Sequence, residues 1–205
     1  MPRLVFPGLT EIASQMSSER ERELLAELRT LFGELRAEMR ERWHRDLPLE
    51  ELLGDRWERA RSLGFGEGSS IYASSYVYGD VRVGRKTWIG PHSLLDGSGG
   101  LVIGDGCDIS AGAQLYTHDT VRRVLSDGRN EIEHASVTIG DRVHVGAGAI
   151  VLKGVAIGDQ SVIAAGSVVN RSIPANSVAA GVPCRPIGTV EIAPDGTVTL
   201  SYPRR

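Results

Sequence analysis

A regular spacing of aliphatic residues limits the folds open to this chain more than any other feature. From residue 71 to residue 169, Ile, Val or Leu recurs at every sixth position, apart from one two-residue skip and one longer insertion. The fourteen positions are Ile71, Val77, Val83, Ile89, Leu95, Ile103, Ile109, Leu115, Ile139, Val145, Val151, Ile157, Ile163 and Val169. Because such residues fill roughly one position in four, fourteen successes by chance have a probability on the order of 10⁻⁸, so the spacing marks an internal repeat.

A six-residue repeat is too short for helices and suits one short strand followed by one turn. Four residues after most of these aliphatic positions the side chain is small or β-branched, and Gly directly follows six of the fourteen. Both inward positions therefore fit a narrow interior, and glycine permits the turn. The 25 glycines and the aromatic content of 5% agree with such a core. We predict a parallel β-solenoid with about five coils between Ile71 and Ile187, stacked about 4.8 Å apart.

Residues 1–66 lack the six-residue period and are predicted to form a helical segment. Between residues 18 and 45, apolar residues recur at spacings of three and four, which predicts one amphipathic helix. Ser18 and Glu21 match a capping box at its start. A second, shorter helix is expected at residues 48–62. The alternating Arg and Glu residues of the first helix suit a solvated face with ion pairs, an RNA-binding arm being the alternative.

Two segments depart from the repeat of the solenoid, which is expected to span residues 67–188. A polar excursion at residues 119–136 has Asp127-Gly128 at its predicted tip, and long loops on rigid scaffolds often carry function. Residues 189–205 contain two strand-like runs on either side of a Pro-Asp-Gly turn, which predicts a C-terminal β-hairpin. Such a hairpin could cover the unpaired edge at the open end of the solenoid.

Composition narrows the function classes. A net charge of −3 and a pI near 6.0 give no basic excess for binding nucleic acid. No run of about 18 apolar residues predicts a membrane-spanning helix, and the N-terminal residues do not resemble a secretion signal, so we expect a cytoplasmic protein without membrane insertion. The only cysteines, Cys107 and Cys184, are most simply free thiols in such a compartment.

Two further motifs resemble a known family. The excursion opens with Tyr116-Thr117-His118-Asp119, and a closing stretch contains IAAGSVVNRSIP and VAAGVPCRPI, which ends at Ile187. With the hexads, these motifs resemble the hexapeptide-repeat acyltransferases, and residues 116–187 are similar to galactoside and maltose acetyltransferases of the xenobiotic and sugar acetyltransferase branch. The short Thr-His-Asp form is similar to that of sugar O-acetyltransferases in polysaccharide pathways.

The resemblance implies a mainly β fold: a left-handed parallel β-helix with three hexads per triangular coil, preceded by the helical segment and followed by the hairpin. The left hand comes from the resemblance alone, because parallel connections are usually right-handed. A homotrimer and acetyl-CoA as co-substrate are also implied, with no metal. A γ-class carbonic anhydrase shares the solenoid, but no two of the histidines that could serve as ligands have the five-residue spacing of its zinc ligands.

The resemblance also assigns candidate roles to single residues. His118 takes the place of the general base, since acyl transfer to a hydroxyl needs a proton acceptor that works near neutral pH; a structural histidine is the alternative. Ala147 and Ala165 match contacts to the pantetheine arm of coenzyme A, or are ordinary corner residues. The adenosine and phosphate end of the coenzyme is matched by Asn170, Arg171 and Arg185.

Three residues are weaker candidates for binding the acceptor. Asp96 lies at the two-residue skip, where its carboxylate could orient the imidazole or accept a sugar hydroxyl, or could simply form an Asp-Gly turn. Asp119 could act similarly or be a plain loop carboxylate. His144 occupies the place of an aromatic acceptor contact in the family, or is a solvated repeat position. His92 and His134 are expected at the surface, and both cysteines are expected to be inert.

These expectations combine into one functional hypothesis with stated rivals. The chain is expected to be an acetyl-CoA-dependent O-acetyltransferase that acts on a hydroxyl of a sugar or glycan precursor. N-acetylation of an amino sugar, free or nucleotide-linked, is the nearest alternative, followed by acetylation of a xenobiotic drug. A non-catalytic solenoid scaffold would keep the hexads and lose the site, which the histidine together with the two arginines argues against.

Overall fold

The computed structural model describes residues 18–203 of the chain. Its tertiary contacts divide the chain into two compact units, residues 1–53 and residues 54–205. The boundary predicted after residue 66 followed the end of the helical sequence pattern, whereas the contacts group the last helix with the solenoid. Among the described helices, none is long and apolar enough to cross a membrane.

The first unit contains α2 (Glu19–Trp43), the predicted long helix. Its N-cap is Ser18, whose hydroxyl accepts a hydrogen bond from the backbone N–H of Glu21 (3.2 Å), while the Glu21 carboxylate accepts the N–H of Ser18 (3.1 Å). The predicted capping box is therefore confirmed. The helix ends at His44, which adopts a left-handed backbone conformation with φ of 52°.

The second predicted helix, residues 48–62, is two helices, α3 (Leu49–Leu53) and α4 (Arg56–Ser62). Gly54 lies between them, and the side chain of Asp55 accepts two backbone N–H groups of the first turn of α4 at 2.8 Å. The prediction of one continuous helix was wrong because a glycine followed by a strong N-cap residue ends one helix and begins another.

Helix α4 packs on the first coil of the solenoid. The Arg59 guanidinium donates to the backbone carbonyl oxygens of Tyr72 and Ser75, the latter at 2.7 Å, and Arg56 donates to the Tyr72 hydroxyl at 2.8 Å. Ala60 of α4 is buried and joins the core. The helix thus covers the N-terminal end of the stack, where apolar side chains would otherwise meet water.

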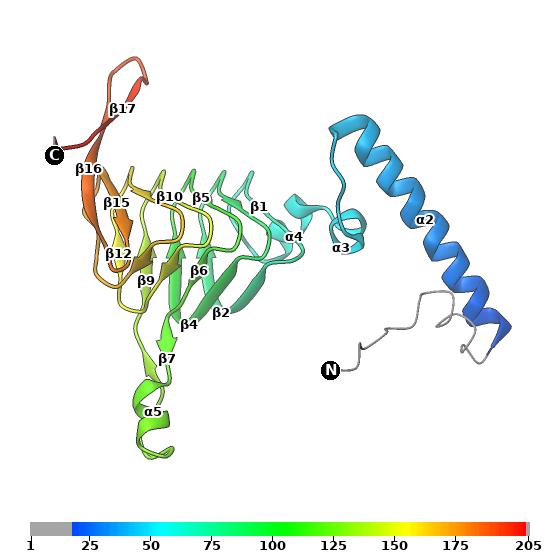
Figure 1. Cartoon of the computed structure of the whole chain (residues 1–205), viewed down its shortest axis with the longest axis horizontal. Coiled ribbons are helices and arrows are strands. Elements are labelled where there is room, and N and C mark those ends of the chain that lie inside the picture. The colour runs from blue at the N-terminus through cyan, green and yellow to red at the C-terminus, as the bar shows by residue number, and fades with distance from the viewer. Residues whose placement is uncertain (1–17, 204–205) are drawn as a thin grey trace, which may run out of the picture. The chain divides into compact units, whose positions relative to one another are not determined.

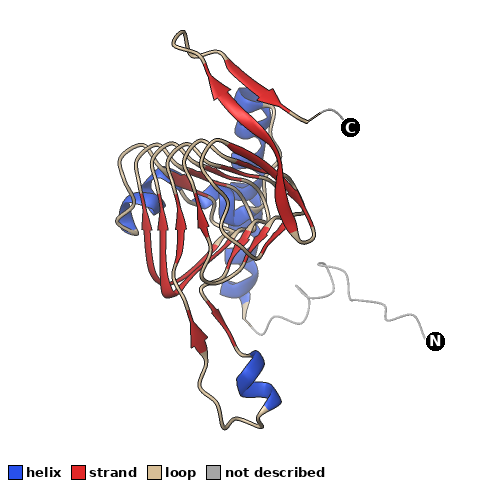
Figure 2. Ribbon diagram, turned by 90° about the vertical axis from the view of Figure 1, so that its left-hand side faces the viewer, coloured by secondary structure: helices blue, strands red, loops and turns tan. Residues whose placement is uncertain are grey.

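The solenoid is a left-handed parallel β-helix with three faces, as predicted. Figures 1 and 2 show its coils stacked along one axis, with the strands of each face running side by side. Ile71 pairs with Ile89, and Val145 with Ile163, eighteen positions on in each case. Three hexads therefore complete one coil, and equivalent residues of successive coils lie in columns along each face.

The three faces are built from short strands. The first face contains β1 (Ser70–Ile71), β3 (Trp88–Ile89), β5 (Asp108–Ile109), β10 (His144–Val145), β13 (Val162–Ile163) and β15 (Ser177–Gly181). The second contains the first parts of β2 (Tyr76–Val83) and β4 (Leu94–Ile103), then β6 (Gln114–Leu115), β11 (Ile150–Val151) and β14 (Val168–Val169). The third contains the later parts of β2 and β4, then β9 (Val137–Ile139) and β12 (Ala156–Ile157), with Ile173 bridged to Ile157.

The predicted hexad positions form the core. Thirteen of the fourteen aliphatic residues are buried, and the exception, Val77 in the first coil, packs against the core from a half-buried position. Small inward residues such as Ala113 and Ala149 fill the remaining slots and are completely buried. A full coil of small aliphatic side chains leaves no space for rings, which explains the low aromatic content.

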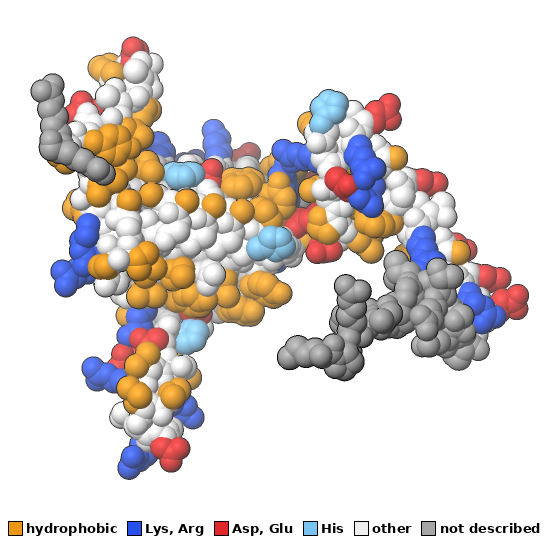
Figure 3. Space-filling view, in the orientation of Figure 1, with side chains coloured by type: hydrophobic (Ala, Val, Ile, Leu, Met, Phe, Trp, Pro, Cys, Tyr) orange, Lys and Arg blue, Asp and Glu red, His pale blue; other side chains and the backbone are white. Residues whose placement is uncertain are grey.

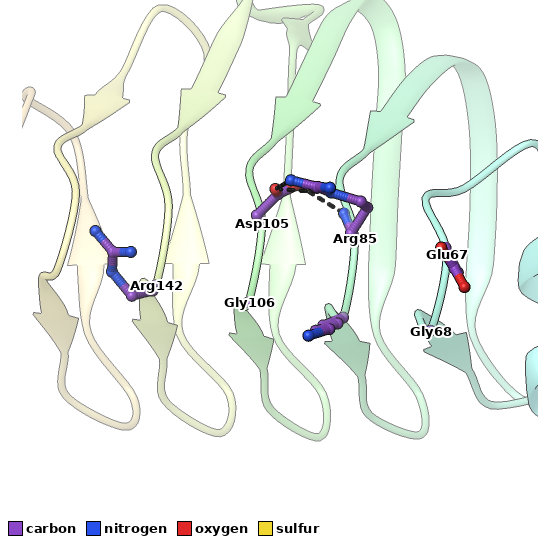
Figure 4. Close-up of a pocket in the computed structure, with 7 residues that line it drawn as sticks. Glu67, Gly68, Arg85, Asp105, Gly106 and Arg142 are labelled. Atoms are coloured by element: carbon purple, nitrogen blue, oxygen red, sulfur yellow. Dashed lines mark hydrogen bonds and ion pairs between the residues drawn. The ribbon is translucent and has the colours of Figure 1, made fainter.

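The corner between the third and first faces is held by aspartates. The carboxylate of Asp105 accepts the backbone N–H of Arg85 in the preceding coil (2.7 Å). In the next two coils, Asp141 accepts the backbone N–H of Asp105 (2.8 Å), and Asp159 accepts that of Asp141 (2.9 Å). The hydrogen bond from the Arg85 N–H, reinforced by the Arg85 guanidinium, lowers the pKa of Asp105. Figure 4 shows this ion pair among the residues that line an open cleft at the same corner. The cleft has a volume of about 600 Å³.

Both interruptions of the six-residue spacing, the two-residue skip and the longer insertion, lie at the corner between the second and third faces, called here the insertion corner. In β4 the register against β2 shifts at residues 97–101, which is the predicted two-residue skip. The longer excursion contains β7 (His118–Asp119), α5 (Val121–Leu125) and β8 (Glu133–His134), with β7 and β8 paired antiparallel. Its turn has positive φ at both Asp127 and Gly128, as expected for an Asp-Gly tip.

The C-terminal residues form the predicted hairpin. Strand β16 (Cys184–Ile192) pairs antiparallel with β15 on one side and with β17 (Val198–Ser201) on the other. Figure 1 shows these strands at the C-terminal end of the stack. They continue the first face and pair the edge of β15, so that β17 is the last strand of this sheet.

Candidate functional site

The candidate site forms where the two insertions meet. Asp96 comes from the skip in β4, and His118 comes from the first strand of the excursion, yet His118 Nδ1 lies 2.7 Å from Asp96 Oδ2. The ladder explains this contact, because Leu95 pairs with Leu115 and the chain leaves both strands at the same corner. The imidazole is thus oriented by a carboxylate from the preceding coil.

Asp96 is held from several sides and is only 2% exposed. Its carboxylate accepts the backbone N–H of Thr117 (2.8 Å) and both the N–H (3.0 Å) and the hydroxyl of Ser98 (2.5 Å). Burial alone would raise the pKa of Asp96, but the hydrogen bonds from Ser98, Thr117 and His118 outweigh it and hold the pKa well below its usual range. Asp96 is therefore a carboxylate throughout the neutral range.

An ionised Asp96 fixes the tautomer of a neutral His118. A carboxylate only accepts hydrogen bonds, so the imidazole donates through Nδ1–H and keeps an unprotonated Nε2. The His118 side chain is 34% exposed, so Nε2 can be reached from solvent. This arrangement can remove a proton from a bound hydroxyl and hold it on a ring whose positive charge faces a carboxylate.

The excursion is anchored at its base by an ion-pair cluster. Lys153, from the turn after β11, has its Nζ 2.8 Å from both Asp119 Oδ2 and Glu133 Oε2, and Arg122 Nε lies 2.8 Å from Glu133 Oε1. The ammonium lowers the pKa of Asp119, and the two carboxylates raise the pKa of Lys153. Asp119 and Glu133 are paired neighbours on β7 and β8, so Lys153 ties both strands of the excursion to the next coil.

The structure adds residues that the sequence reasoning did not select. Thr117 is completely buried, and its hydroxyl donates to the backbone carbonyl of Asp96 (2.8 Å) while accepting the N–H of Gly99 (2.7 Å). His134 is exposed, as expected, but it is the cross-strand partner of His118, with ring centroids 5.9 Å apart. The motif beside His118 was the available signal for Thr117, whereas His134 depends on the folding of the excursion.

His144 lies apart from this cluster. It is on β10 of the first face, where its half-exposed ring points outward and its Nδ1 is 3.7 Å from the Asp108 carboxylate of the neighbouring strand. Of the three residues predicted to contact the acceptor, Asp96 and Asp119 therefore adjoin His118 within one chain, and His144 lies on another face.

The residues predicted to bind the coenzyme lie at two corners. Ala147 and Ala165 are exposed neighbours in one column between the first and second faces, joined by the hydrogen bond from Gly166 N–H to the Ala147 carbonyl (2.9 Å). We call this the alanine corner. Asn170 and Arg171 instead follow β14 at the C-terminal end of the insertion corner, where the Arg185 guanidinium donates to the Asn170 side chain (3.1 Å). Arg171 is exposed.

The remaining candidates do not join a site. Cys107 and Cys184 are free and buried, and burial raises the pKa of both thiols, which disfavours the reactive thiolate. Within residues 18–203, no group of three or more His, Cys, Asp or Glu side chains is arranged to hold a metal ion. The cleft of Figure 4 is lined by Glu67, Arg85, Arg142 and their neighbours. It lies at the corner between the third and first faces, away from His118 and from the alanine corner.

Comparison with known proteins identifies relatives. Residues 136–171 match a family model described as the hexapeptide repeat of succinyl-transferase. The chain is 39% identical over 149 residues to nodulation protein L of Rhizobium leguminosarum bv. viciae, a match that covers 66% of this chain and 75% of that protein.

Similar solved structures are also acyltransferases. A galactoside acetyltransferase in complex with coenzyme A is 29% identical with a TM-score of 0.58, covering 80% of this chain and 82% of that one. A hexapeptide-repeat acetyltransferase of Vibrio cholerae O1 biovar eltor, complexed with acetyl coenzyme A, is 29% identical with a TM-score of 0.56, covering 84% and 90%. An N-acyltransferase of Bacillus cereus, at 21% identity and a TM-score of 0.55 over 64% and 88%, shares the fold. The chain is therefore an enzyme that belongs to the hexapeptide-repeat acyltransferases.

Proposed function

We propose that the protein transfers the acetyl group of acetyl-CoA to a hydroxyl of a sugar or glycan precursor, with His118 as general base. The observation that carries this proposal is the 2.7 Å contact between His118 Nδ1 and the buried, ionised Asp96. A hydroxyl is a weak acid, so its attack on a thioester needs a base, and this pair leaves Nε2 free to act as one. An amine acceptor depends less on such a base.

The reaction needs no covalent enzyme intermediate. Nε2 of His118 takes the acceptor proton while the acceptor oxygen attacks the thioester carbonyl. The tetrahedral intermediate collapses, the carbon–sulfur bond breaks, and the imidazolium returns its proton to the departing thiolate. Asp96 stabilises the imidazolium between these steps, and backbone N–H groups near the carbonyl are expected to stabilise the oxyanion.

Acetyl-CoA is the donor in this proposal. Both 29% identical solved acetyltransferases hold coenzyme A or its acetyl form, which supports the same donor here. Exposed alanines let the pantetheine arm approach the backbone at Ala147 and Ala165. Arg171 and Arg185 supply cations for the phosphates, and Asn170 lies next to Arg185.

We propose a homotrimer because one chain carries two halves of a site at different corners. The insertion corner holds His118, and the alanine corner holds Ala147 and Ala165. The second face lies between them, and its outward column is mostly apolar: Tyr76, Leu94, Gln114, Ile150 and Val168. If three copies turn this face toward a common axis, the insertion corner of each copy meets the alanine corner of the next, and the ring closes.

The tip of the excursion fits the same assembly. Its helix α5 exposes Val121, Val124 and Leu125, the last at 83%, beside Arg122 and Arg123. Figure 3 shows hydrophobic and basic side chains side by side on the excursion. Light scattering at micromolar protein should give three times the chain mass. A monomeric mass with full activity would refute the shared site.

The acceptor class is tested by thiol release from acetyl-CoA across sugars, amino sugars and nucleotide sugars. Release with sugars that carry only hydroxyl groups supports O-acetylation, whereas release confined to amino sugars would favour N-acetylation. If neither these acceptors nor drug-like amines and alcohols cause thiol release, a non-catalytic solenoid scaffold would be favoured. The proposal includes a cytoplasmic location, which agrees with two free thiols.

A further inference from the structure

Strands β7 and β8 form a short antiparallel ribbon whose two sides differ. His118 pairs with His134, and Asp119 pairs with Glu133. Because neighbouring residues of a strand point to opposite sides, the two imidazoles share one side and the two carboxylates share the other. The carboxylates are both bound by Lys153 at 2.8 Å, so the carboxylate side is already occupied within the chain.

The two imidazoles lie close together but are held differently. Their ring centroids are 5.9 Å apart, with an angle of 35° between the ring planes. The ring of His118 is oriented by the Asp96 carboxylate, 2.7 Å away. The ring nitrogens of His134 have no hydrogen-bond or ion-pair partner among residues 18–203, and the side chain is exposed. A second imidazole with open nitrogens therefore stands beside the proposed base.

The backbone that carries His134 is fixed on both sides of it. Before it, the Glu133 side chain is bound by Lys153. After it, the N–H of Ala135 donates to the backbone carbonyl of Thr117 at 2.9 Å. The position of His134 is thus set by the fold, and only its side chain is open to a ligand.

We propose that His134 binds a second hydroxyl group of the acceptor sugar, beside the hydroxyl whose proton His118 takes. This inference rests on the proposed function. A neutral imidazole has one donor and one acceptor nitrogen, so either tautomer can hydrogen-bond a hydroxyl. The reacting oxygen is a poorer partner for His134, because it gives its only hydrogen to His118 and needs a lone pair for the thioester carbonyl.

The spacing of the two rings indicates the kind of acceptor. A hydrogen bond places an oxygen about 2.8 Å from a ring nitrogen. Rings with centroids 5.9 Å apart can therefore reach two oxygens on adjacent or next-but-one carbons of one sugar. The acceptor is a sugar that carries a free hydroxyl close to the one that becomes acetylated. His134 selects and positions this sugar, and His118 alone takes the proton.

Two variants of His134 separate its hydrogen bond from its ring contact. His134→Phe keeps a ring against His118 and removes both nitrogens, whereas His134→Gln keeps a donor and an acceptor. The probes are the methyl glycosides of glucose, galactose and mannose. The glycoside that wild type acetylates fastest is the parent, and its monodeoxy analogues complete the set. Thiol release from acetyl-CoA gives kcat and KM for each, and circular dichroism melting checks that each variant is folded.

For the parent glycoside, His134→Phe should lower kcat/KM about three- to tenfold, which is the effect of one lost hydrogen bond, and His134→Gln should lower it less. One monodeoxy analogue lacks the hydroxyl that His134 binds. Wild type should use it more slowly by a similar factor, and His134→Phe should cause no further loss with it. The KM for acetyl-CoA and the acid limb of kcat/KM should stay as in wild type, because His118 is intact.

Two results with an active wild type would overturn the role of His134 and leave the proposed function standing. An unchanged kcat/KM in His134→Phe would mean that the ring does not bind the acceptor. A loss by the same factor with every monodeoxy analogue would mean that His134 acts through His118 or on the thioester. If wild type released no thiol with any of the glycosides, the proposed function would fail, and this inference would fail with it.

Discussion

The regular coils of the solenoid and its two insertions serve different purposes. In the coils, Ile109 and Val151 point inward, are completely buried and pair with equivalent residues one coil away. At the insertions, Asp96 and His118 meet each other through polar atoms. In a regular coil, each residue takes the same backbone position as its equivalents in the neighbouring coils. A pair of side chains that must meet in a particular geometry, such as Asp96 and His118, therefore requires an interruption of the repeat.

We therefore expect coil residues to determine stability and residues of the insertions to determine the rate of acetyl transfer, which mutations can test. Substitution of a coil residue should change the free energy of unfolding and leave the rate of acetyl transfer unaltered. Substitution in an insertion should change the rate. Asp96 is the residue at which the two effects should mix, because it is both buried and in contact with the imidazole.

The largest expected effect is that of His118→Ala. A base that takes the acceptor proton in the transition state contributes about 10² to 10⁴ in rate, so kcat should fall by that factor. The KM for acetyl-CoA should change little, since the predicted coenzyme contacts are other residues. The measurement is steady-state thiol release at saturating substrates, with isothermal titration of acetyl-CoA to show that the variant still binds.

The pH profile separates a base from a structural histidine. The wild-type kcat/KM should fall on acidification, because a protonated imidazole has no lone pair for the acceptor proton. His118→Asn should lack this acid limb and be nearly as slow as His118→Ala, since an amide cannot hold the proton. Turnover above about a tenth of wild type for His118→Ala would make the histidine structural.

The next effect concerns a coil residue. Ile109 is completely buried between β3 and β10, so Ile109→Ala should lower the free energy of unfolding by about 2 to 5 kcal/mol through lost burial and a cavity. Well below the melting temperature, kcat should stay within about twofold of wild type, because the substitution leaves the reacting groups in place. Denaturant unfolding and thiol release on the same samples give both numbers. A large loss of kcat with a small loss of stability would contradict the division between coils and insertions.

Asp96→Asn should combine the two effects. An amide can place its N–H group toward Nδ1, which stabilises the wrong tautomer and removes the charge opposite the imidazolium, so kcat should fall on the order of 10²-fold. The amide also leaves one of the N–H or O–H donors around it without an acceptor, which costs about 1 to 3 kcal/mol of stability.

The stability part has a defined pH dependence. The folded-state pKa of Asp96 lies below the ordinary value for an Asp, so its carboxylate stabilises the fold fully above that ordinary value, near 4, and progressively less as the pH falls below it. The difference in unfolding free energy between wild type and Asp96→Asn should therefore shrink between about pH 4 and pH 2. Urea unfolding across this range measures it. A difference that is constant with pH would mean that the carboxylate charge does not stabilise the fold.

The fold was predictable because its rule is local and repeated. Each hexad has its inward-pointing aliphatic residue at the same position. The stacking of Leu115 on Val151 therefore follows from counting hexads along the sequence. The break at Gly54 was missed, although Gly-Asp was visible, because the helical period continues across it. Only a capping argument at Asp55 would have separated the two helices.

The site was predictable in part. The motif and the resemblance selected His118, and the skip drew attention to Asp96, but the contact between them depends on both insertions leaving the coil at one corner. Lys153 was overlooked, although it follows Val151 by the same two positions that separate Thr117 from Leu115. Equivalent positions of successive coils lie next to each other, and this holds for residues at the corners as well as for residues in the core.

A smaller effect is expected for the coenzyme contacts. If Arg171 and Arg185 hold phosphates, replacing either by Ala should raise the KM for acetyl-CoA about tenfold and leave the acceptor KM nearly unchanged. Arg82 offers a matched control, because it is an exposed arginine on the third face, paired with Asp80 at 3.0 Å. A rise confined to the acceptor KM would put the two arginines in the other pocket.

The smallest effect is expected for Lys153→Met, which keeps most of the side-chain volume and removes the ammonium between Asp119 and Glu133. Ion pairs near the surface contribute about 0 to 1 kcal/mol each, so kcat should fall about two- to fivefold as the excursion that carries His118 loosens. Trypsin should cut faster after Arg122 or Arg123 in the same variant, which reports the loosening directly. The chain's other lysine, Lys86, lies at the corner between the third and first faces. Lys86→Met is therefore the matched control for loss of one positive charge. If both substitutions lowered kcat equally without faster cleavage in Lys153→Met, the effect would be one of net charge, and the excursion would hold His118 in position without the lysine.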